Sequence, residues 1–366
     1  MIGFGFIGSR GHAPTYASEE STKIVAVADG CAEQRRLAEQ LLPGVRVYPD
    51  AESLLAAERD RLDFVDIATP PNDHARVAHM ALDRGLHVLC EKPLAATPED
   101  ARAMLDHARA ARRVIFPCHN YKHAPVVKAV RDVLAAGTIG PVNLVTLQTF
   151  RNTHAKGVSS WRPDWWRERA VAGGGIAMDH GSHTFYLAFE WMNAYPTGIS
   201  AHAATHGPYD TEDNFSCTLK FPHGTATAHL SWTSGTRKVI YTIHGTRGAI
   251  RVDDEDIEIA TLQAGPGVEA PGSPGRWRLD NRQAPSDWMD ASHKGWFASL
   301  LGEFRRAISE RDYVGKDARE ALLCVELIHR GYESARKGCQ MVRIGSIDAP
   351  TALSAGSLGR ERAEVA

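Results

Sequence analysis

Asp179 and His183 are the residues whose types and spacing best fit proton transfer. They stand four apart at the start of an apolar helical run, so on a helix they would share one face, where a carboxylate can orient or polarise an imidazole. An imidazole with a pKa near ~6.5 is suited to accept the proton of a hydroxyl group at neutral pH. The alternative is a hydrogen-bonded core histidine on an apolar helix, and the pair alone does not decide between the two.

Two loops nearer the N-terminus carry further polar residues. Thr69-Pro70-Pro71-Asn72-Asp73-His74 follows one predicted strand, and Cys90-Glu91-Lys92-Pro93-Leu94 follows the next. Ligands of open α/β sheets bind at the carboxyl ends of parallel strands, so both loops are expected at the same edge. A lysine ammonium there would stabilise a developing alkoxide. The alternative for Glu91 and Lys92 is a solvated charge pair before a helix.

The chain opens with a glycine pattern typical of dinucleotide binding. Gly3-Phe4-Gly5-Phe6-Ile7-Gly8 matches G-x-G-x-x-G, whose glycines allow a tight turn and let a pyrophosphate approach the backbone. Asp29 ends the next strand, where an acidic side chain binds ribose hydroxyls, and this favours NAD over NADP. Arg35 and Arg36 keep dual use open, and Asp29 as a mere turn residue is the alternative.

A further motif makes the order of motifs specific. It begins with Trp166-Arg167 and continues with Gly173-Gly174-Gly175-Ile176-Ala177-Met178-Asp179-His180-Gly181-Ser182-His183. With the glycine pattern, Thr-Pro-x-x-x-His and Glu-Lys-Pro, this order resembles the family of glucose-fructose oxidoreductase, inositol dehydrogenase and rhizopine catabolism proteins, Gfo/Idh/MocA. The resemblance covers roughly residues 1–345. It implies a Rossmann domain, a C-terminal domain on an open sheet, NAD or NADP, and a homodimer or homotetramer formed through that sheet.

The resemblance also implies that Lys92, Asp179 and His183 carry catalysis in the NAD(P)-dependent oxidation or reduction of a CH–OH group. His183 would serve as proton shuttle, while a cationic Lys92 would bond the reacting oxygen. A desolvated Lys92 acting as base is the minor alternative. The residues expected to hold the cofactor are Gly3, Gly5, Phe6, Ile7, Gly8, Asp29, Thr69, Pro70, His74, Glu91 and Lys92.

Polar and aromatic residues near the domain junction are candidates for substrate contacts. Tryptophan rings stack on the C–H faces of sugars while polar neighbours bind hydroxyls. No arginine pair or lysine cluster in the sequence marks a phosphate site, so we expect an unphosphorylated sugar, glycoside or cyclitol. Packing of the domain seam is the alternative for the tryptophans. The candidates are Asn120, Tyr121, Lys122, Trp161, Trp166, Arg167 and His180.

Other reactions and a metal stay open as alternatives. A redox-neutral glycosidase or lyase would oxidise a sugar carbon transiently and return the hydride, and a non-catalytic nucleotide-binding regulator would be expected to lack the catalytic residues. We predict no metal site, because Asp179 and His180 are adjacent and do not share a helical face. The histidines that raise the question of a metal site are His119, His123, His154, His180 and His183.

The hydrophobic patterns predict two kinds of sheet. Short β-branched runs alternate with amphipathic stretches in the first third, as in a parallel sheet with crossover helices. Longer alternating runs without intervening helices follow, which predicts a mostly antiparallel sheet. The strands are expected at 24–28, 64–68, 87–90, 114–117, 142–150, 199–205, 215–221, 225–232, 239–244 and 249–252, and the helices at 32–42, 50–59, 72–84, 98–111, 124–136, 293–309 and 317–337.

These patterns predict a chain of two domains. The first is an α/β Rossmann domain with a doubly wound parallel sheet, residues 1–118, and the second is an α+β domain with an open, mostly antiparallel sheet, residues 119–345, for substrate binding and oligomerisation. Residues 264–290 read as a long surface loop and 346–366 as a flexible tail. Because only Met1 and Ile2 precede Gly3, we hypothesise that the true start lies upstream.

Composition excludes several other classes of protein. A net charge of −2 gives no reason to expect nucleic acid or an anionic membrane as partner. No window approaches 18 apolar residues, no secretory signal pattern opens the chain, and the six cysteines form no C-x-x-C pair. We therefore expect a cytoplasmic enzyme with reduced thiols and a small-molecule substrate.

Overall fold

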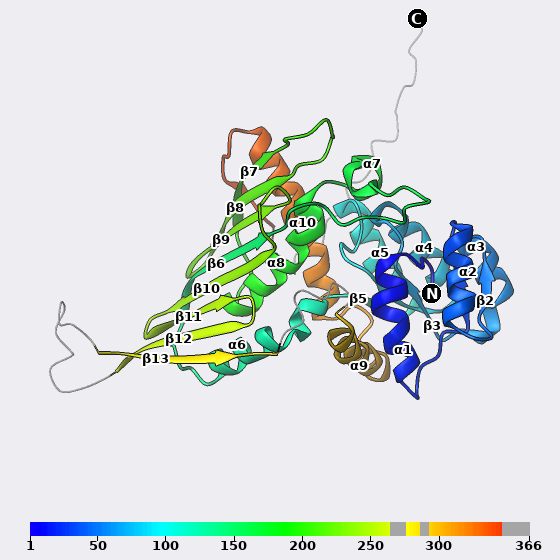
Figure 1. Ribbon diagram of the computed structural model, residues 1–366, viewed down its shortest axis with the longest axis horizontal. Helices are drawn as coiled ribbons and strands as arrows, with labels where there is room; N and C mark the ends of the chain where they lie inside the picture. The colour runs from blue at the N-terminus through cyan, green and yellow to red at the C-terminus, as the bar shows by residue number, and fades with distance from the viewer. Residues whose placement is uncertain (264–275, 286–292, 346–366) are drawn as a thin grey trace, which may run out of the picture.

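The computed structural model describes residues 1–263, 276–285 and 293–345. The chain forms a parallel sheet in its N-terminal third and a nine-stranded sheet from residues 142–343, with helices between the two (Figure 1). This confirms the predicted fold class, a Rossmann-type α/β part joined to an α+β part on an open, mostly antiparallel sheet.

Ile2 holds the parallel sheet together. It bridges Ala28 on one side and Ile67 on the other, and so joins the pair β1 and β2 to the three strands β3, β4 and β5. Helices cover both faces, which explains why most side chains of β1, β3, β4 and β5 are buried. The strands are β1 (Ala26–Ala28), β2 (Arg46–Tyr48), β3 (Phe64–Ile67), β4 (His87–Cys90) and β5 (Ile115–Pro117).

The helices of this part begin where the sequence supplies caps. Asp50 accepts a hydrogen bond from the Ser53 backbone at the start of α3, and Thr97 accepts one from Asp100 at the start of α5. The four helices predicted between residues 32 and 111 are confirmed to within two residues at each end. The helices are η1 (Ile7–His12), α1 (Ala13–Ser18), α2 (Ala32–Leu41), α3 (Ala51–Ala57), α4 (Pro71–Asp83), α5 (Pro98–Ala111), η3 (Asn120–His123) and α6 (Pro125–Ala135).

The second sheet has the strand order β13-β12-β11-β10-β6-β9-β8-β7-β14. Its described strands pair antiparallel except β6 with β9, and a hairpin at residues 220–224 joins β8 to β9. The strands are β6 (Val142–Phe150), β7 (Gly198–Ala204), β8 (Asn214–Phe221), β9 (Gly224–Ser231), β10 (Lys238–Gly245), β11 (Gly248–Asp253), β12 (Asp256–Gln263), β13 (Arg276–Gln283) and β14 (Val342–Arg343).

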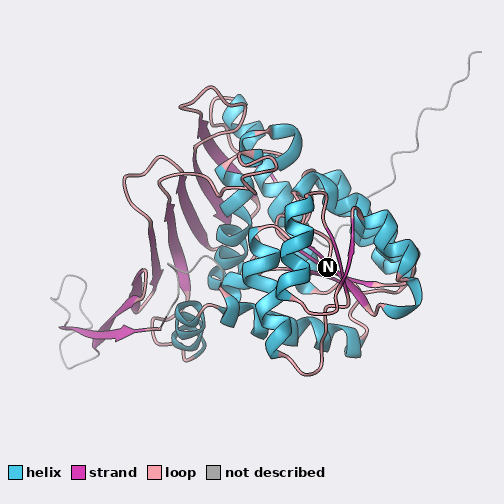
Figure 2. Cartoon of the chain, turned by 45° about the vertical axis from the view of Figure 1, so that its right-hand side comes forward, coloured by secondary structure: helices cyan, strands magenta, loops and turns pink. Residues whose placement is uncertain are grey.

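Helices α8 (Ile176–Met192) and α10 (Lys316–Arg336) pack on one face of this sheet, and Figure 2 shows the other face without a helix among the described residues. The strands alternate accordingly, since Val145 and Leu147 of β6 are buried under α8 while Leu144 is exposed. Helix α8 is buried almost all round, as its largely apolar sequence requires. It carries Asp179 and His183 into the centre of the molecule.

Helix α9 (Lys294–Glu310) follows the second sheet in the chain but packs on the first. Its Phe297, Leu300 and Phe304 join Tyr16 and Leu89 in one buried cluster. The domain boundaries at residues 118 and 345 stay a prediction, because the two halves of the chain share this core.

The prediction of a loop at residues 264–290 is wrong for the middle of this range, because Arg276–Gln283 forms strand β13, which pairs antiparallel with β12. Its charged residues suit an edge strand, where a hydrophobic alternation is not required. Residues 264–275, 286–290 and the predicted tail 346–366 lie outside the described residues. In the part of the chain that the structure describes, no helix has the length and apolarity needed to cross a bilayer.

Candidate active site

A cavity of about 840 Å³ lies where the loops after β1, β3 and β4 meet α8 and the adjoining ends of β6 and β10. The volume falls within the ~300–1,000 Å³ usual for small-molecule sites. Lys92 lines it from the loop after β4, and Asp179 and His183 line it from α8. Residues from distant parts of the sequence therefore share one space.

Gly3 and Gly5 line the end of the cavity where a dinucleotide would lie. Gly3 has a φ of +91°, and a Cβ there would lie 2.5 Å from the carbonyl oxygen of Ala68, so a glycine is required. No atom lies within 4 Å of the place of a Cβ on Gly5. The backbone is thus open to a pyrophosphate just before a helix begins, as dinucleotide binding requires.

Asp29 stands at the end of β1 on the same cavity. Its Oδ2 accepts a hydrogen bond from the Phe4 backbone at 2.7 Å and its Oδ1 one from Cys31 at 2.8 Å. Arg35 donates to the carbonyl oxygens of Asp29 and Gly30 and does not line the cavity. The carboxylate is therefore fixed where ribose hydroxyls would be read, with no described guanidinium of this loop turned towards a 2′-phosphate.

Lys92 and Asp179 form an ion pair. The Lys92 Nζ donates to the carbonyl oxygen of Asp179 at 2.9 Å and to its Oδ1 at 2.9 Å. Burial opposes the charge, but attraction to Asp179 and Glu91 raises the pKa of Lys92 above its usual value, and Lys92 in turn lowers the pKa of Asp179 to about 2. The expectation that Asp179 orients His183 is corrected: this carboxylate holds Lys92, which stays cationic.

His183 is held by aromatic neighbours. Its Nδ1 lies 2.6 Å from the hydroxyl oxygen of Tyr186, and its ring stacks on Tyr121 with centroids 3.9 Å apart. The same hydroxyl oxygen accepts a hydrogen bond from the Tyr121 backbone at 3.2 Å. Burial, and after it the charge of Lys92, lowers the pKa of His183 well below its usual value. The imidazole is therefore neutral and oriented.

Aromatic and polar side chains line the rest of the cavity. Trp165 and Trp166 stack with centroids 4.4 Å apart, and the Lys92 Nζ lies 5.5 Å from the Trp166 ring. Flat aromatic faces beside a lysine suit a polyhydroxylated ring. Five predicted substrate residues line the cavity: Asn120, Tyr121, Trp161, Trp166 and His180.

Family models match both halves of the chain. One, described as an oxidoreductase family with an NAD-binding Rossmann fold, matches residues 1–119, and the other, the GFO/IDH/MocA C-terminal domain, matches residues 127–251. The protein belongs to the Gfo/Idh/MocA family. It is therefore an oxidoreductase with an NAD-binding Rossmann domain, as the order of its motifs predicts.

Named relatives match this oxidoreductase at modest identity. The D-apiose dehydrogenase of Paraburkholderia graminis is 28% identical over 98% of this chain and 94% of its own length. The D-glucoside 3-dehydrogenase of Escherichia coli is 27% identical over 61% of this chain and 66% of its own. A levoglucosan dehydrogenase in complex with NADH and levoglucosan shares the fold, with a TM-score of 0.77, 20% identity and coverage of 94% and 98% of the two chains.

Two predicted cofactor residues of this family member do not line the cavity. A Cβ on Gly8 would lie 2.7 Å from the Gly3 carbonyl oxygen, so Gly8 serves close packing of the helix on the loop. His74 is fully buried, with its ring nitrogens 2.9 Å from the carbonyl oxygen of Pro93 and 2.8 Å from that of Thr69. His74 therefore links the loop that follows β3 to the loop that follows β4. The other predicted residues line the cavity: Gly3, Gly5, Phe6, Ile7, Asp29, Thr69, Pro70, Glu91 and Lys92.

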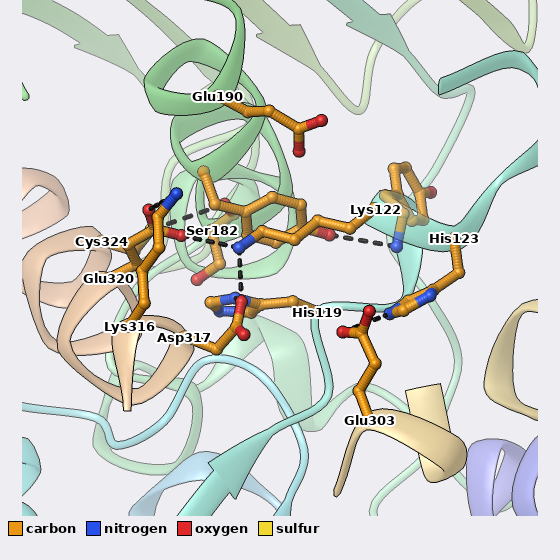
Figure 3. Close-up of polar contacts among 12 residues, drawn as sticks. His119, Lys122, His123, Ser182, Glu190, Glu303, Lys316, Asp317, Glu320 and Cys324 are labelled. Carbon is orange, nitrogen blue, oxygen red and sulfur yellow. Dashed lines mark hydrogen bonds and ion pairs between the residues drawn. The ribbon is translucent and has the colours of Figure 1, made fainter. Parts of the chain in front are cut away.

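The sequence-based prediction that Lys122 and Arg167 bind the substrate is also wrong about their positions. Figure 3 shows Lys122 between two acidic residues of α10, with its Nζ 2.5 Å from Asp317 and 2.6 Å from Glu320. Arg167 pairs with Asp213. Neither lines the cavity, because each cation is bound to buried or half-buried carboxylates elsewhere.

Sequence analysis missed a buried histidine beneath the cofactor end. His12 lies one turn beyond Gly8, with its Nδ1 2.9 Å from Asp66 and its Nε2 3.1 Å from Glu91. Burial opposes its charge, but attraction to Asp66 raises the pKa of His12 to about 10. An imidazolium thus fixes the Glu91 carboxylate. Other cavity residues that were not predicted include Asp50, Arg151, Asn152, Thr153, Trp232, Arg237 and His293.

Two groups of described side chains have the spacing of metal ligands: His12 with Glu91 and Cys118, and His119 with Asp317 and Glu320. In the first, His12 hydrogen-bonds Glu91, and in the second the Lys122 ammonium contacts both carboxylates. The carboxylates of both groups thus already contact a basic side chain, and neither group includes the Asp179, His180 and His183 set considered in the sequence. The prediction of no metal site stays untested.

Asp29→Ala is expected to raise the KM for NAD by about 10-fold or more, because a hydrogen bond to a charged group is worth roughly 1.5–3 kcal/mol. The ratio of kcat/KM with NADP to that with NAD should rise. Steady-state kinetics with both cofactors measures this, with the exposed Asp60→Ala as matched control. An unchanged cofactor ratio would mean that Asp29 serves only the turn.

Tyr186→Phe is expected to lower kcat by roughly 3- to 10-fold, the worth of one ordinary hydrogen bond, because the His183 ring loses the contact that fixes it. Affinity for NADH, measured by fluorescence titration, should stay within 2-fold, since Tyr186 does not line the cavity. The exposed Tyr209→Phe is the control. A fully active Tyr186→Phe enzyme would show that stacking on Tyr121 alone orients His183.

Proposed function

We propose that the protein transfers hydride between NAD and a carbon bearing a secondary hydroxyl in a sugar, glycoside or cyclitol. The observation that carries this proposal is the cavity itself, which joins the glycine turn and Asp29 to Lys92, Asp179 and His183. NAD, when bound, accepts or returns the hydride at its nicotinamide ring. The chain's own residues must then handle the hydroxyl proton and the charge on oxygen.

The proton goes to His183. A neutral imidazole carries one N–H, and we assign it to Nδ1, which donates to the Tyr186 hydroxyl oxygen. The lone pair of Nε2 is then free to accept the hydroxyl proton as hydride leaves the same carbon. Because the pKa of His183 is lowered, the imidazole is unprotonated and ready over the whole neutral range.

Lys92 stabilises the charge on oxygen. An ammonium has three donors, and two of them are bound to the carbonyl oxygen and the Oδ1 of Asp179. The third is left for the reacting oxygen, where it would stabilise the developing alkoxide. Asp179 contributes by holding the ammonium in place and charged, and it needs no contact with substrate.

The substrate class rests on two supports. The cavity wall carries stacked tryptophans beside polar side chains, an arrangement suited to the alternating faces of a sugar ring. Relatives of this chain are named for D-apiose, D-glucoside and levoglucosan dehydrogenation. Both favour a carbohydrate or a close analogue over a simple hydroxy acid.

A screen of sugars, glycosides and inositols with NAD and NADP tests the proposal, with absorbance at 340 nm followed beside product chromatography. NADH formation with one class of ring is the expected result. Product without net NADH would replace the dehydrogenase by the redox-neutral glycosidase or lyase. The absence of any product would contradict both.

We also propose that the open face of the nine-stranded sheet joins copies of the chain into a homodimer or homotetramer. By strand register, Leu144, Leu262, Trp277 and Leu279 share this face, and all four are exposed. A broad apolar sheet face without a covering helix is typical of an interface. Sedimentation equilibrium of the purified protein would give its mass in solution.

A further inference from the structure

The residue that precedes helix α8 is Gly175, which has no side chain to cap the helix. The backbone N–H groups of a first helical turn need partners from elsewhere, and they are costly to bury unpaired. The first turn of α8 is buried, and it carries Asp179, whose carbonyl oxygen and Oδ1 bind Lys92. Whatever holds this turn therefore also holds two of the candidate catalytic residues.

Glu212 caps α8 from the segment just before β8. Its Oε2 accepts a hydrogen bond from the Gly175 backbone at 2.9 Å, and its Oε1 accepts one from the Ala177 backbone at 3.0 Å. The carbonyl oxygen of Glu212 accepts a third, from the Ile176 backbone, at 3.1 Å. One residue thus binds three consecutive N–H groups, and its negative charge lies at the end of the helix where the helix dipole favours it.

The Glu212 carboxylate is held in turn by α10. The hydroxyl group of Tyr332 donates to its Oε1 at 2.8 Å, and the Arg169 Nη2 lies 3.9 Å from its Oε2. Only 3% of Glu212 is exposed. Neither Glu212 nor Tyr332 lines the cavity, so any effect of the two residues on hydride transfer must pass through α8.

Two glycines before α8 fit this arrangement. A Cβ on Gly175 would overlap the carbonyl oxygen of Glu212, and a Cβ on Gly174 would overlap the hydroxyl oxygen of Tyr332. A side chain at either position would therefore push the start of α8 away from the residues that bind it. The close approach of Glu212 and Tyr332 explains why the sequence has glycine at both places.

We infer that Glu212 is a positioning residue, which sets the start of α8 so that Asp179 holds Lys92 at the reacting oxygen. The inference rests on the proposed hydride transfer and adds to it a residue outside the cavity. The Asp179 backbone N–H donates to the carbonyl oxygen of Gly175 at 3.1 Å, so a shift of Gly175 passes directly to Asp179. Misplacing a group by about 1 Å can slow a reaction about 100-fold.

A displaced Asp179 would change Lys92 in a way that a loss of stability alone would not. Burial opposes the charge of Lys92, and the attraction of Asp179 is the largest effect that raises its pKa. If Asp179 moves away, less attraction opposes burial, so the pKa of Lys92 falls. Glu91 and Tyr121 also raise this pKa, and neither belongs to α8. The pKa of Lys92 therefore reports on the position of Asp179.

Glu212→Gln tests the inference, because an amide keeps the shape of the side chain but can accept hydrogen bonds at only one of its two terminal atoms. We expect kcat to fall about 10- to 100-fold, while NADH affinity, measured by fluorescence titration, stays within 2-fold. Tyr332→Phe removes one donor to the carboxylate and should lower kcat by about 2- to 5-fold.

Competitive labelling of lysines with acetic anhydride at a series of pH values gives the pKa of Lys92 without a substrate. Peptide mass spectrometry reads the labelling, with the exposed Lys220 as internal standard. The pKa of Lys92 should be lower in Glu212→Gln than in the wild type. Thr97→Ala is the matched control, since Thr97 caps α5 by accepting the Asp100 backbone N–H and does not line the cavity. It should lower the melting temperature but leave kcat and the pKa of Lys92 unchanged.

Two results would overturn the inference. One is a Glu212→Gln enzyme whose kcat is within 2-fold of the wild type, and the other is a Glu212→Gln enzyme in which the pKa of Lys92 is unchanged. If Glu212→Gln fails to fold, an unchanged pKa of Lys92 in Tyr332→Phe refutes the inference, and a lowered one supports it. If no substrate is oxidised, the proposed hydride transfer fails separately, and the labelling still decides whether Glu212 positions Asp179.

Discussion

Replacing His183 by alanine is expected to lower kcat by roughly 10²- to 10⁴-fold, the usual contribution of a positioned general base. The variant loses the imidazole whose Nε2 would accept the hydroxyl proton, and water must take its place. NADH affinity should change by less than 2-fold, because the glycine turn and Asp29 that fit the dinucleotide lie at the other end of the cavity. Single-turnover kinetics and fluorescence titration measure the two effects separately.

The same assignment predicts the direction in which kcat/KM changes with pH. For alcohol oxidation the base must be unprotonated, so kcat/KM falls as pH decreases through the pKa of His183 and is flat above it. Since that pKa is lowered by burial and by Lys92, the decline should occur well below pH 6.5. The exposed His244→Ala is the matched control. If His183→Ala weakens NADH binding as much as it slows turnover, His183 is a structural residue and not the base.

The fold was predictable where the sequence repeats a strong local pattern. Helix 98–111 is amphipathic and opens with Thr97 and Pro98, and the structure places α5 over the same residues. Strand β13 was not predictable in this way, because an edge strand needs no buried face and its Arg, Asp and Asn residues resemble a loop. Hydrophobic periodicity in the sequence indicates which side chains are buried, but it does not indicate whether the backbone of an edge strand pairs with its neighbour.

The sequence predicted which residues line the candidate site better than it predicted which residues they contact. Lys92, Asp179 and His183 do line one cavity, since motifs at strand ends and a helix start converge on the same edge. Helical spacing suggested that Asp179 would serve His183, but a salt bridge 87 residues apart in sequence takes that carboxylate instead. Lys122 likewise turns to Asp317 and Glu320, which no local pattern links to it. Long-range pairing of charges decides such contacts.

Lys92→Met is expected to lower kcat by about 10²- to 10³-fold, the cost of losing a donor aimed at a developing oxyanion. Methionine keeps much of the length and apolar character of the side chain but removes the ammonium that Asp179 holds. The variant should also unfold more easily, by about 3 kcal/mol, because the Asp179 carboxylate is left buried without its partner. Kinetics and denaturant titration give the two numbers.

The double variant Lys92→Met with Asp179→Asn separates chemistry from stability. Both charges are then absent, so the penalty of a lone buried carboxylate disappears and most of the stability should return. Turnover should stay low, because neither amide nor thioether can supply a cation to the reacting oxygen. If turnover recovers together with stability, the ion pair only holds the cavity in shape. A stable, inactive double variant would instead identify the Lys92 ammonium as the group that stabilises the alkoxide.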